Sequence, residues 1–303
     1  MPRPAAPVVL TIAGFDPSSG AGATADLKTI AAHGCYGVAC LTALTVQSTS
    51  GVHRTEPVSA KLVAETLWEL ASDFNFDAVK IGMLATAPIV DAVALFLRRV
   101  MPPNVVLDPV LRSSSGAELL DREGRLRFTK RLLRLATVIT PNLTEAAFLS
   151  AVHVESLAEM KSAAQRLHRQ GARNVVITGG HLNRPVDLLS MAAAKGCEQV
   201  EFAGKRVRSA ATHGTGCAFS SALACNLALG KSLYDAVRLA KEYVTQAIRN
   251  ACTLGGGPMG EGAGALNHFH AVEEQLRSRR ATSQSLREPL SARKGKKSAP
   301  RRR

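Results

Sequence analysis

Short apolar runs rich in β-branched residues alternate with helical patterns along this chain, from residue 8 to about residue 250. Each run has the length of one strand, and the runs lie at residues 8–14, 38–47, 78–84, 104–110, 137–142 and 174–180. Strands that are apolar on both faces and separated by helices are typical of a mostly parallel sheet with a helical layer on each side. The pattern therefore predicts a three-layer α/β fold.

The segment from about residue 186 to residue 207 has a different pattern and predicts two or three short strands without helices between them. We expect a small antiparallel edge on the sheet at this point. A helix over about residues 214–229 and another over residues 233–251 follow. Because no Pro-, Gly- or Ser-rich linker divides this part of the chain, residues 1–276 are predicted to form one domain.

The net charge of +14 is concentrated at the C-terminus. Residues 277–303 contain eleven Lys and Arg against one acid, Glu288, so this segment carries +10 and the preceding 276 residues only +4. With so few large apolar side chains the segment is expected to be a disordered basic tail. An electrostatic contact of the tail with nucleic acid or an anionic lipid surface is the alternative.

The six cysteines form no CxxC pair and no regular framework, as in proteins whose thiols stay reduced. We find neither a signal-peptide pattern nor a run of 18 apolar residues, so we expect a cytoplasmic protein without a membrane span.

Polar and small residues gather where the predicted strands end. Examples are Gly14, Gln47, Asp108, Asn142 and Gly180. In an open parallel sheet the ligand site lies at the carboxyl ends of the strands. The repeated pattern therefore favours a binding site at this edge of the sheet over a set of unrelated turn residues.

The stretch ATHGTGCAFSSALA, residues 211–224, predicts a glycine turn that leads into a helix. A helix N-terminus binds anions through its unpaired N–H groups, and Gly214 and Gly216 would let a phosphate approach the backbone. Thr215 could cap the helix or donate its hydroxyl. Cys217 in the first turn is expected to have its thiol pKa lowered from about 8.5 toward neutrality, which suits a general base. A small buried apolar role for Cys217 is equally compatible with its position.

Two other patterns resemble known binding motifs, but we do not interpret them as functional sites. GAGATA, residues 20–25, fits a dinucleotide fingerprint, but five residues separate it from the strand, and the next strand ends in Gln47 instead of an acid. A nicotinamide-dependent oxidoreductase is therefore disfavoured. His268 and His270 have no third metal ligand near them in the sequence, and we expect a surface role for both.

Several motifs together resemble the hydroxymethylpyrimidine kinase / phosphomethylpyrimidine kinase family of thiamine biosynthesis. The resemblance covers residues 8 to about 270 and is carried by AGFDPSSGAGATADLKT, KIGML, VVLDPV, ITPNLTEA, GGH, HGTGCAFSSALA and AKEYVTQAI, in that order. It implies a ribokinase-like fold and, as a partner, a second copy of the chain in a homodimer. The basic tail has no counterpart in the family pattern.

The resemblance also implies roles for individual residues. The pyrimidine would be bound by Gly14, Asp26, Gln47, Met83 and Val110, with Gln47 pairing with the aminopyrimidine edge. Cys217 would be the catalytic base, within the anion-binding turn of Gly214, Thr215 and Gly216. Phosphate and nucleotide would be bound by Asp108, Asn142, Glu145, Thr178, Gly180 and Lys241. Asp108 and Glu145 would hold Mg²⁺, through water.

One position departs from the family pattern: Thr178 stands in TGGH where the family usually has a lysine. Three consequences stay open, namely slower phosphoryl transfer, loss of the second phosphorylation, or compensation by another cation such as Arg112.

The implied activity is ATP- and Mg²⁺-dependent phosphorylation of 4-amino-5-hydroxymethyl-2-methylpyrimidine and then of its monophosphate. A pyridoxal or pyridoxine kinase is the first alternative, against which Gln47 argues because a carboxamide matches a donor–acceptor edge. A catalytically weakened vitamer-binding regulator is the second alternative.

Overall fold

The computed structural model describes residues 6–113, 116–209, 211, 213–252, 264–274 and 276. The predicted basic tail, residues 277–303, lies outside the described residues, so its disorder and its contacts stay predictions.

The described strands form one nine-stranded sheet in the order β3-β2-β1-β4-β5-β6-β7-β8-β9. Their bounds are β1 Val8–Phe15, β2 Tyr36–Ser48, β3 Gly51–Pro57, β4 Ala78–Ile81, β5 Val105–Leu107, β6 Val138–Ile139, β7 Asn174–Ile177, β8 Val186–Ala192 and β9 Cys197–Ala203. Strands β2, β1, β4, β5, β6 and β7 run parallel, whereas β3, β8 and β9 pair antiparallel. The predicted parallel sheet and its antiparallel edge at β8 and β9 are confirmed; β3, at the other edge, was not predicted.

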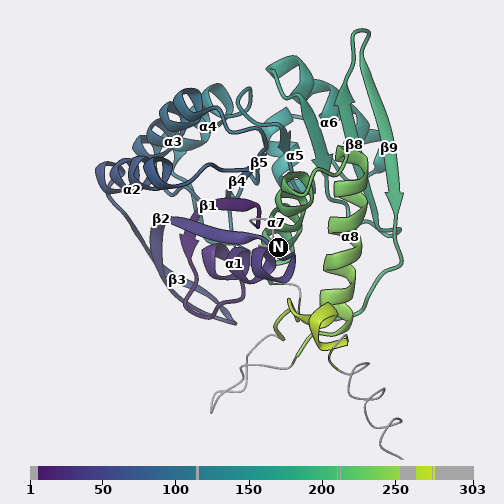
Figure 1. The fold of residues 1–303 in the computed structure, drawn as a ribbon. Helices are drawn as coiled ribbons and strands as arrows, with labels where there is room; N and C mark the ends of the chain where they lie inside the picture. Colours follow the sequence, from purple (N-terminus) through teal and green to yellow (C-terminus); the bar gives the residue numbers. More distant parts are fainter. Residues whose placement is uncertain are drawn as a thin grey trace, which may run out of the picture.

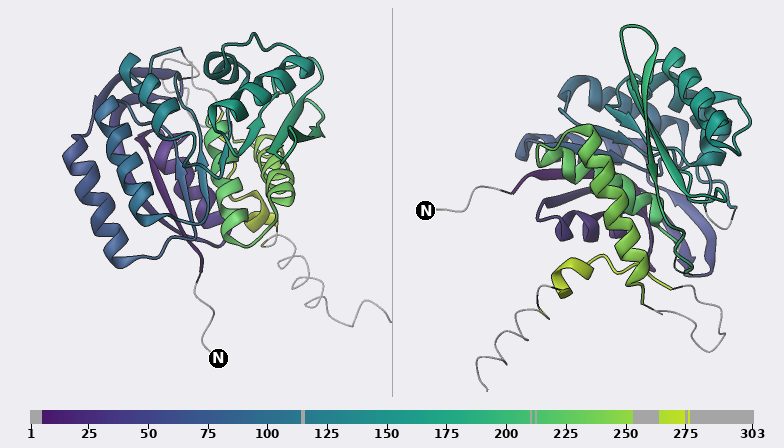
Figure 2. Two further views of the ribbon diagram at one scale, coloured as in Figure 1. Left: turned by 90° about the horizontal axis from the view of Figure 1, so that it is seen from above. Right: turned by 90° about the vertical axis from the view of Figure 1, so that its right-hand side faces the viewer.

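Helices cover both faces of this sheet, as the apolar runs predict (Figures 1 and 2). Their bounds are α1 Gly22–Ala32, α2 Ala60–Asp73, α3 Ala87–Val100, α4 Arg122–Arg131, α5 Leu143–Ser150, α6 Leu157–Gln170, α7 Thr215–Ala228 and α8 Leu233–Arg249. Helices α2 to α6 pack on one face, and α1, α7 and α8 pack on the other.

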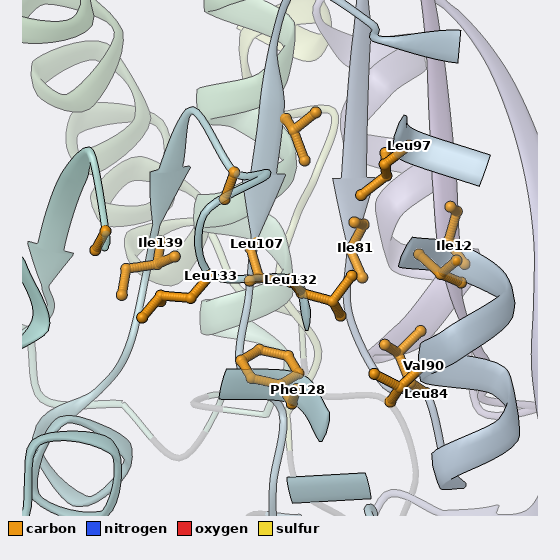
Figure 3. Packing of buried hydrophobic residues seen from close by; sticks show 14 of the residues in the cluster. Ile12, Ile81, Leu84, Val90, Leu97, Leu107, Phe128, Leu132, Leu133 and Ile139 are labelled. Carbon is orange, nitrogen blue, oxygen red and sulfur yellow. The ribbon is translucent and has the colours of Figure 1, made fainter. Parts of the chain in front are cut away.

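Alternate residues of each central strand enter the two cores, because successive strand side chains point to opposite faces. Ile12, Ile81 and Leu107 pack with α3 and α4, where Phe128 and Leu132 close the core (Figure 3). Their neighbours Val9, Ala78 and Val106 pack against α1, α7 and α8 instead. The sheet is thus buried on both sides, and functional side chains are left to the ends of the strands.

The segment after α8 packs against the body of the protein through His268, which is only 5% exposed. Its Nδ1 lies 3.1 Å from the hydroxyl of Thr29 in α1, and its carbonyl accepts a hydrogen bond from Tyr243 in α8 at 3.1 Å. The surface role expected for His268 is therefore wrong: the ring is buried between two helices that are remote in the sequence.

None of the helices in the described part of the chain is both long and apolar enough to cross a membrane.

Candidate active site

The predicted glycine turn is the N-terminus of α7, and its first glycine is required by geometry. Gly214 is the N-cap residue with φ 77°, and a Cβ on it would lie 1.8 Å from the carbonyl oxygen of Gly20. Thr215 is the first helical residue, so the capping role considered for it is wrong. Apart from its chain neighbours and the backbone of its own helix, no atom of the described residues lies within 4 Å of a Cβ built on Gly216. The N–H groups of this first turn therefore have room beside them for a ligand anion.

The loop between β1 and α1 faces this turn and is equally tight. Gly22 has φ 59°, and a Cβ there would lie 2.3 Å from the carbonyl oxygen of Gly14. Asp16, 3% exposed, accepts hydrogen bonds from the backbone N–H groups of Ser18 and Ala21, each at 2.8 Å. The loop that approaches the helix terminus is thus held by one carboxylate.

Three of the residues predicted to bind the pyrimidine ring lie together. Met83 and Val110 belong to one small apolar cluster, which also contains Ala43 of β2. A Cβ on Gly14 would lie 2.8 Å from the sulfur of Met83, so Gly14 lies directly against this side chain. The structure therefore provides an apolar surface at the carboxyl ends of β1, β4 and β5.

Gln47, near the end of β2, lies beside the same turn. Its Nε2 is 3.1 Å from Nε2 of His213, the residue before Gly214. That same ring nitrogen is 3.2 Å from Oδ2 of Asp16. Asp16, His213 and Gln47 thus form a polar chain from the β1–α1 loop to the end of β2, and only Gln47 was predicted as a site residue.

Asp26, predicted to line the pyrimidine site, is fully buried between the sheet and α7. Its two carboxylate oxygens accept hydrogen bonds from Lys80 at 2.9 and 2.8 Å, from Thr11 at 2.6 Å and from Ser221 at 2.8 Å. Every acceptor position of this carboxylate is engaged within the protein. Its hydrogen bonds suit a residue that holds β1, β4 and α7 in position beneath the candidate site.

Lys80 remains protonated in this network. Burial favours the neutral amine, but the carboxylates, above all Asp26 with Asp108 adding to it, outweigh burial and raise the pKa of Lys80. A positive charge is therefore held directly under the first turns of α7.

Asp108, at the end of β5, lies beside the second turn of α7. Its Oδ2 is 2.9 Å from the hydroxyl of Ser220, and the side chain is almost entirely buried. Burial raises the pKa of Asp108, whereas Lys80 and Ser220 act in the opposite direction. Two consecutive serines of α7 therefore contact two acids, Ser220 reaching Asp108 and Ser221 reaching Asp26.

The lowered thiol pKa expected for Cys217 is wrong. Burial raises the pKa of Cys217 to about 12, and Asp26 and Asp108 add to this effect. The charge of Lys80 and the backbone N–H of Gly22 favour the thiolate, but they do not outweigh burial. The helix N-terminus alone is too weak to activate a thiol that lies between two carboxylates.

Asn142 and Glu145 form a capping box at the start of α5. The Asn142 side chain accepts from the N–H of Glu145, and the Glu145 carboxylate accepts from the N–H of Asn142, both at 2.9 Å. Burial, together with the charge of Asp108, raises the pKa of Glu145 to about 8. The element predicted to bind phosphate and metal is thus also what begins this helix.

Thr178 joins the same edge of the sheet, because it forms an isolated parallel bridge with Asn142. Two residues later Gly180 is exposed. Lys241 of α8 does not project freely, since its Nζ lies 2.6 Å from Oδ2 of Asp187, whose Oδ1 accepts from the N–H of Gly179 at 2.9 Å. Lys241 is therefore linked to the TGGH loop through an acid.

The residues predicted to hold Mg²⁺ fit a cation bound through water. Two nearly buried carboxylates, Asp108 and Glu145, oppose each other's ionisation, and hard cations prefer oxygen ligands. Within the described ranges no group of three or more His, Cys, Asp and Glu residues could hold a metal ion. Any Mg²⁺ here would need water or phosphate oxygens to complete its coordination.

Sequence reasoning missed Lys80, Ser220, Ser221 and His213 as parts of the site. Lys80 could have been identified from the sequence, because a single lysine in a strand that is buried on both faces needs an acidic partner. Two adjacent hydroxyls in the alanine-rich start of α7 are a weaker signal of the same kind. No sequence pattern indicates the contacts of His213, since its partners are distant in the sequence.

The chain belongs to a known family of kinases. A family model described as phosphomethylpyrimidine kinase matches residues 16–262. The hydroxymethylpyrimidine/phosphomethylpyrimidine kinase of Aquifex aeolicus is 40% identical over 252 residues, which cover 82% of this chain and 97% of that protein.

Two further relatives differ in length or in name. The thiamine biosynthesis bifunctional protein of Geobacter sulfurreducens is 44% identical over 268 residues, and the match covers 88% of this chain but only 53% of that protein. The crystal structure of an ADP complex of Bacillus subtilis pyridoxal kinase superposes with a TM-score of 0.77 at 34% identity, covering 88% of this chain and 99% of the other.

Proposed function

Because the chain belongs to the phosphomethylpyrimidine kinase family, we propose that it transfers phosphoryl groups from ATP to a pyrimidine alcohol. The first acceptor is the hydroxymethyl group of 4-amino-5-hydroxymethyl-2-methylpyrimidine, and the second is the resulting monophosphate. The relatives that share this name are kinases, and ATP is the expected donor.

The observation that carries the proposal is that the start of the β1–α1 connection lies against both features: Gly14 approaches Met83, and Gly20 approaches Gly214 at the start of α7. The apolar surface of Gly14, Met83 and Val110 would receive the ring. The N–H groups at the helix start, beside the open space at Gly216, would receive the transferring phosphoryl group. An alcohol held between the two surfaces has its oxygen directed at the anion-binding turn.

Each polar residue would then have a defined task. The N–H groups of the turn stabilise the charge that spreads over the phosphoryl oxygens, and the Lys80 charge beneath α7 adds to that field. Asn142 keeps Glu145 in place through the capping box. Lys241 and Gly180 would lie along the nucleotide phosphates, with Thr178 contributing a hydroxyl.

Mg²⁺ held by Asp108 and Glu145 through water would neutralise phosphate charge. The positive charge of the cation would favour the ionised form of both carboxylates and offset the repulsion between them.

Cys217 is proposed as the base that accepts the proton of the alcohol, but only in the loaded complex. A thiol with a pKa of about 12 carries almost no thiolate at neutral pH. One of the two acids that raise this pKa is Asp108, and a bound cation would offset the negative charge of Asp108. A cation at Asp108 would therefore favour the thiolate relative to the ligand-free enzyme, where burial, Asp26 and Asp108 together disfavour it.

Mass analysis of the products tests this function. The full chain is incubated with the pyrimidine alcohol, ATP and Mg²⁺, and mono- and diphosphate are resolved by mass. We expect both products, and a monophosphate alone would mean that Thr178 has removed the second step. Absence of either product would contradict the proposal.

A pyridoxal kinase activity is the second candidate, favoured by the structural likeness to the Bacillus subtilis pyridoxal kinase. Measuring ADP release with each alcohol gives the two values of kcat/KM. We expect the aminopyrimidine to have the higher value, since the Gln47 carboxamide suits a donor–acceptor edge. A higher kcat/KM for pyridoxal would reverse the assignment.

Assembly and location belong to the same proposal. The family resemblance suggests a homodimer, which sedimentation of the full chain would test. The six cysteines are free thiols, which favours a reducing compartment such as the cytoplasm.

A further inference from the structure

The carboxamide of Gln47 lies between two side chains whose own hydrogen bonds restrict what they can offer it. Its Nε2 is 3.1 Å from Nε2 of His213, and its Oε1 is 3.2 Å from Oγ1 of Thr45. The two ends of a carboxamide have nearly the same size, so the neighbouring donors and acceptors decide which end is the oxygen.

The His213 side offers a donor. Its Nε2 also lies 3.2 Å from Oδ2 of Asp16, a carboxylate that accepts three further hydrogen bonds, two from Ser18 and one from Ala21. Although burial opposes ionisation, the bonds from His213, Ser18 and Ala21 hold the pKa of Asp16 below its ordinary value. An ionised carboxylate only accepts, so the His213 nitrogen carries the hydrogen. Because its distances to the two side chains are nearly equal, this one hydrogen is shared between Asp16 and the end of Gln47 that faces it, as in a three-centre hydrogen bond.

The Thr45 side offers an acceptor. The Thr45 hydroxyl lies 2.9 Å from the carbonyl oxygen of Phe15, which also only accepts. A hydroxyl has one hydrogen, and the shorter contact uses it. What Thr45 presents to Gln47 is therefore a lone pair.

Both neighbours are satisfied together in one orientation, with the amide oxygen toward His213 and the amide nitrogen toward Thr45. A half-turn of the carboxamide about its last bond produces this orientation without moving any other atom. Each neighbour then uses one position at its end of the group. One oxygen lone pair and one N–H remain, which is the set that a ring nitrogen and an adjacent exocyclic amine require.

We propose that His213, held by Asp16, is a specificity-determining positioning residue that fixes the Gln47 carboxamide for an aminopyrimidine edge. The inference rests on the proposed function and adds a residue to it that touches no reacting atom. Gly20 leaves room for the ring, because a Cβ on Gly20 would lie 2.6 Å from Cδ2 of His213. Thr45 defines the other end of the carboxamide.

The test compares two alcohols that differ only at the recognised edge: the aminopyrimidine substrate and its analogue without the 4-amino group. For each enzyme the ratio of the two kcat/KM values is measured. This ratio is insensitive to damage at the phosphate turn, because both alcohols use the same turn. The variants are His213→Leu, which removes the donor, and His213→Gln, whose terminal N–H replaces the imidazole donor.

We expect the ratio to fall about 3- to 10-fold in His213→Leu, as for the loss of one hydrogen bond, and to stay within about threefold of wild type in His213→Gln. An unchanged ratio in His213→Leu, with an active wild type, would overturn this inference and leave the proposed function intact. Failure of the wild type with both alcohols would instead overturn the proposed function and the inference with it.

Thr45→Val provides an independent variant if His213→Leu does not fold. It removes the acceptor at the other end of the carboxamide and nearly conserves shape. We expect a loss of discrimination of the same size. A ratio equal to that of wild type would contradict the proposed orientation.

Discussion

Lys80 and Asp26 form an ion pair in which neither side chain is exposed: Nζ lies 2.9 and 2.8 Å from the two carboxylate oxygens. The pair connects strand β4 to helix α1, and Ser221 extends it to α7. Three elements that position the candidate site are thus joined through one carboxylate. A charge pair placed there supports both the geometry and the electric field of the helix terminus near it.

Replacing Lys80 by Met should destabilise the fold by about 3–5 kcal/mol, because the substitution leaves Asp26 buried without its counter-charge. Urea unfolding followed by circular dichroism measures this loss. Lys61→Met is the matched control, since the Lys61–Glu65 pair at 3.8 Å is exposed on α2 and should contribute less than about 1 kcal/mol. Equal stabilities of the two variants would show that the buried pair does not support the fold.

The parallel strands were predictable because each is a short apolar run whose composition reports burial on both faces. Strand β3 was not predictable, since its seven residues, GVHRTEP, are mainly polar and mostly exposed. They form a strand because they pair with β2. The composition of a segment does not indicate which other strand it pairs with.

The site residues divide in the same way. The turn at Gly214 followed from a glycine pattern that is local in the sequence, and Asn142 and Glu145 followed from the family resemblance. The burial of His268 and the raised pKa of Cys217 depend on contacts with α1 and with Asp26 and Asp108, which only the assembled fold brings together.

Gly214 and Gly216 should respond differently to replacement by alanine, although only Thr215 separates them. Gly214→Ala places a Cβ 1.8 Å from a backbone oxygen at φ 77°, and we expect a loss of at least about 2 kcal/mol in the free energy of unfolding. Gly216→Ala meets nothing within 4 Å inside α7 and should leave stability unchanged or raise it by up to about 1 kcal/mol. Thermal unfolding of both variants checks the contrast, which fails if Gly214→Ala melts with wild type.

Cys217 should be nearly inert toward iodoacetamide in the ligand-free enzyme. With a pKa of about 12, its thiolate fraction at pH 8 is roughly 10³-fold below that of an ordinary thiol. Peptide mass mapping over time gives the rate at each cysteine, and Cys252, which is exposed, serves as the comparison in the same molecule. We expect the Cys217 rate to rise with pH up to the limit of stability. Alkylation of Cys217 as fast as Cys252 at pH 8 would contradict the raised pKa.

The role of Cys217 as a base is tested separately by turnover. Cys217→Ala should lower kcat by roughly 10²–10⁴-fold, the usual loss for a general base, while the unfolding midpoint stays near that of wild type. Activity within a few-fold of wild type would return Cys217 to a packing role.

His268 should make stability depend on pH below neutrality. Burial, with the nearby charge of Lys28, lowers the pKa of His268 to about 4, whereas the unfolded chain binds the proton near pH 6.5. Between pH 6.5 and 4 the unfolded state therefore holds one more proton than the folded state. The contribution of His268 to stability is complete above pH 6.5 and decreases as pH falls, by up to about 1.4 kcal/mol per pH unit.

His268→Gln removes the titrating ring, so its stability should decrease less on acidification than that of wild type. Urea unfolding of both proteins at pH 7.5, 6.5, 5.5 and 4.5 gives the difference directly, and the carboxylates common to both cancel. We expect a constant difference above pH 7 and a steady change in favour of His268→Gln below pH 6.5. Parallel curves over the whole range would mean that the ring becomes protonated without leaving its site between α1 and α8.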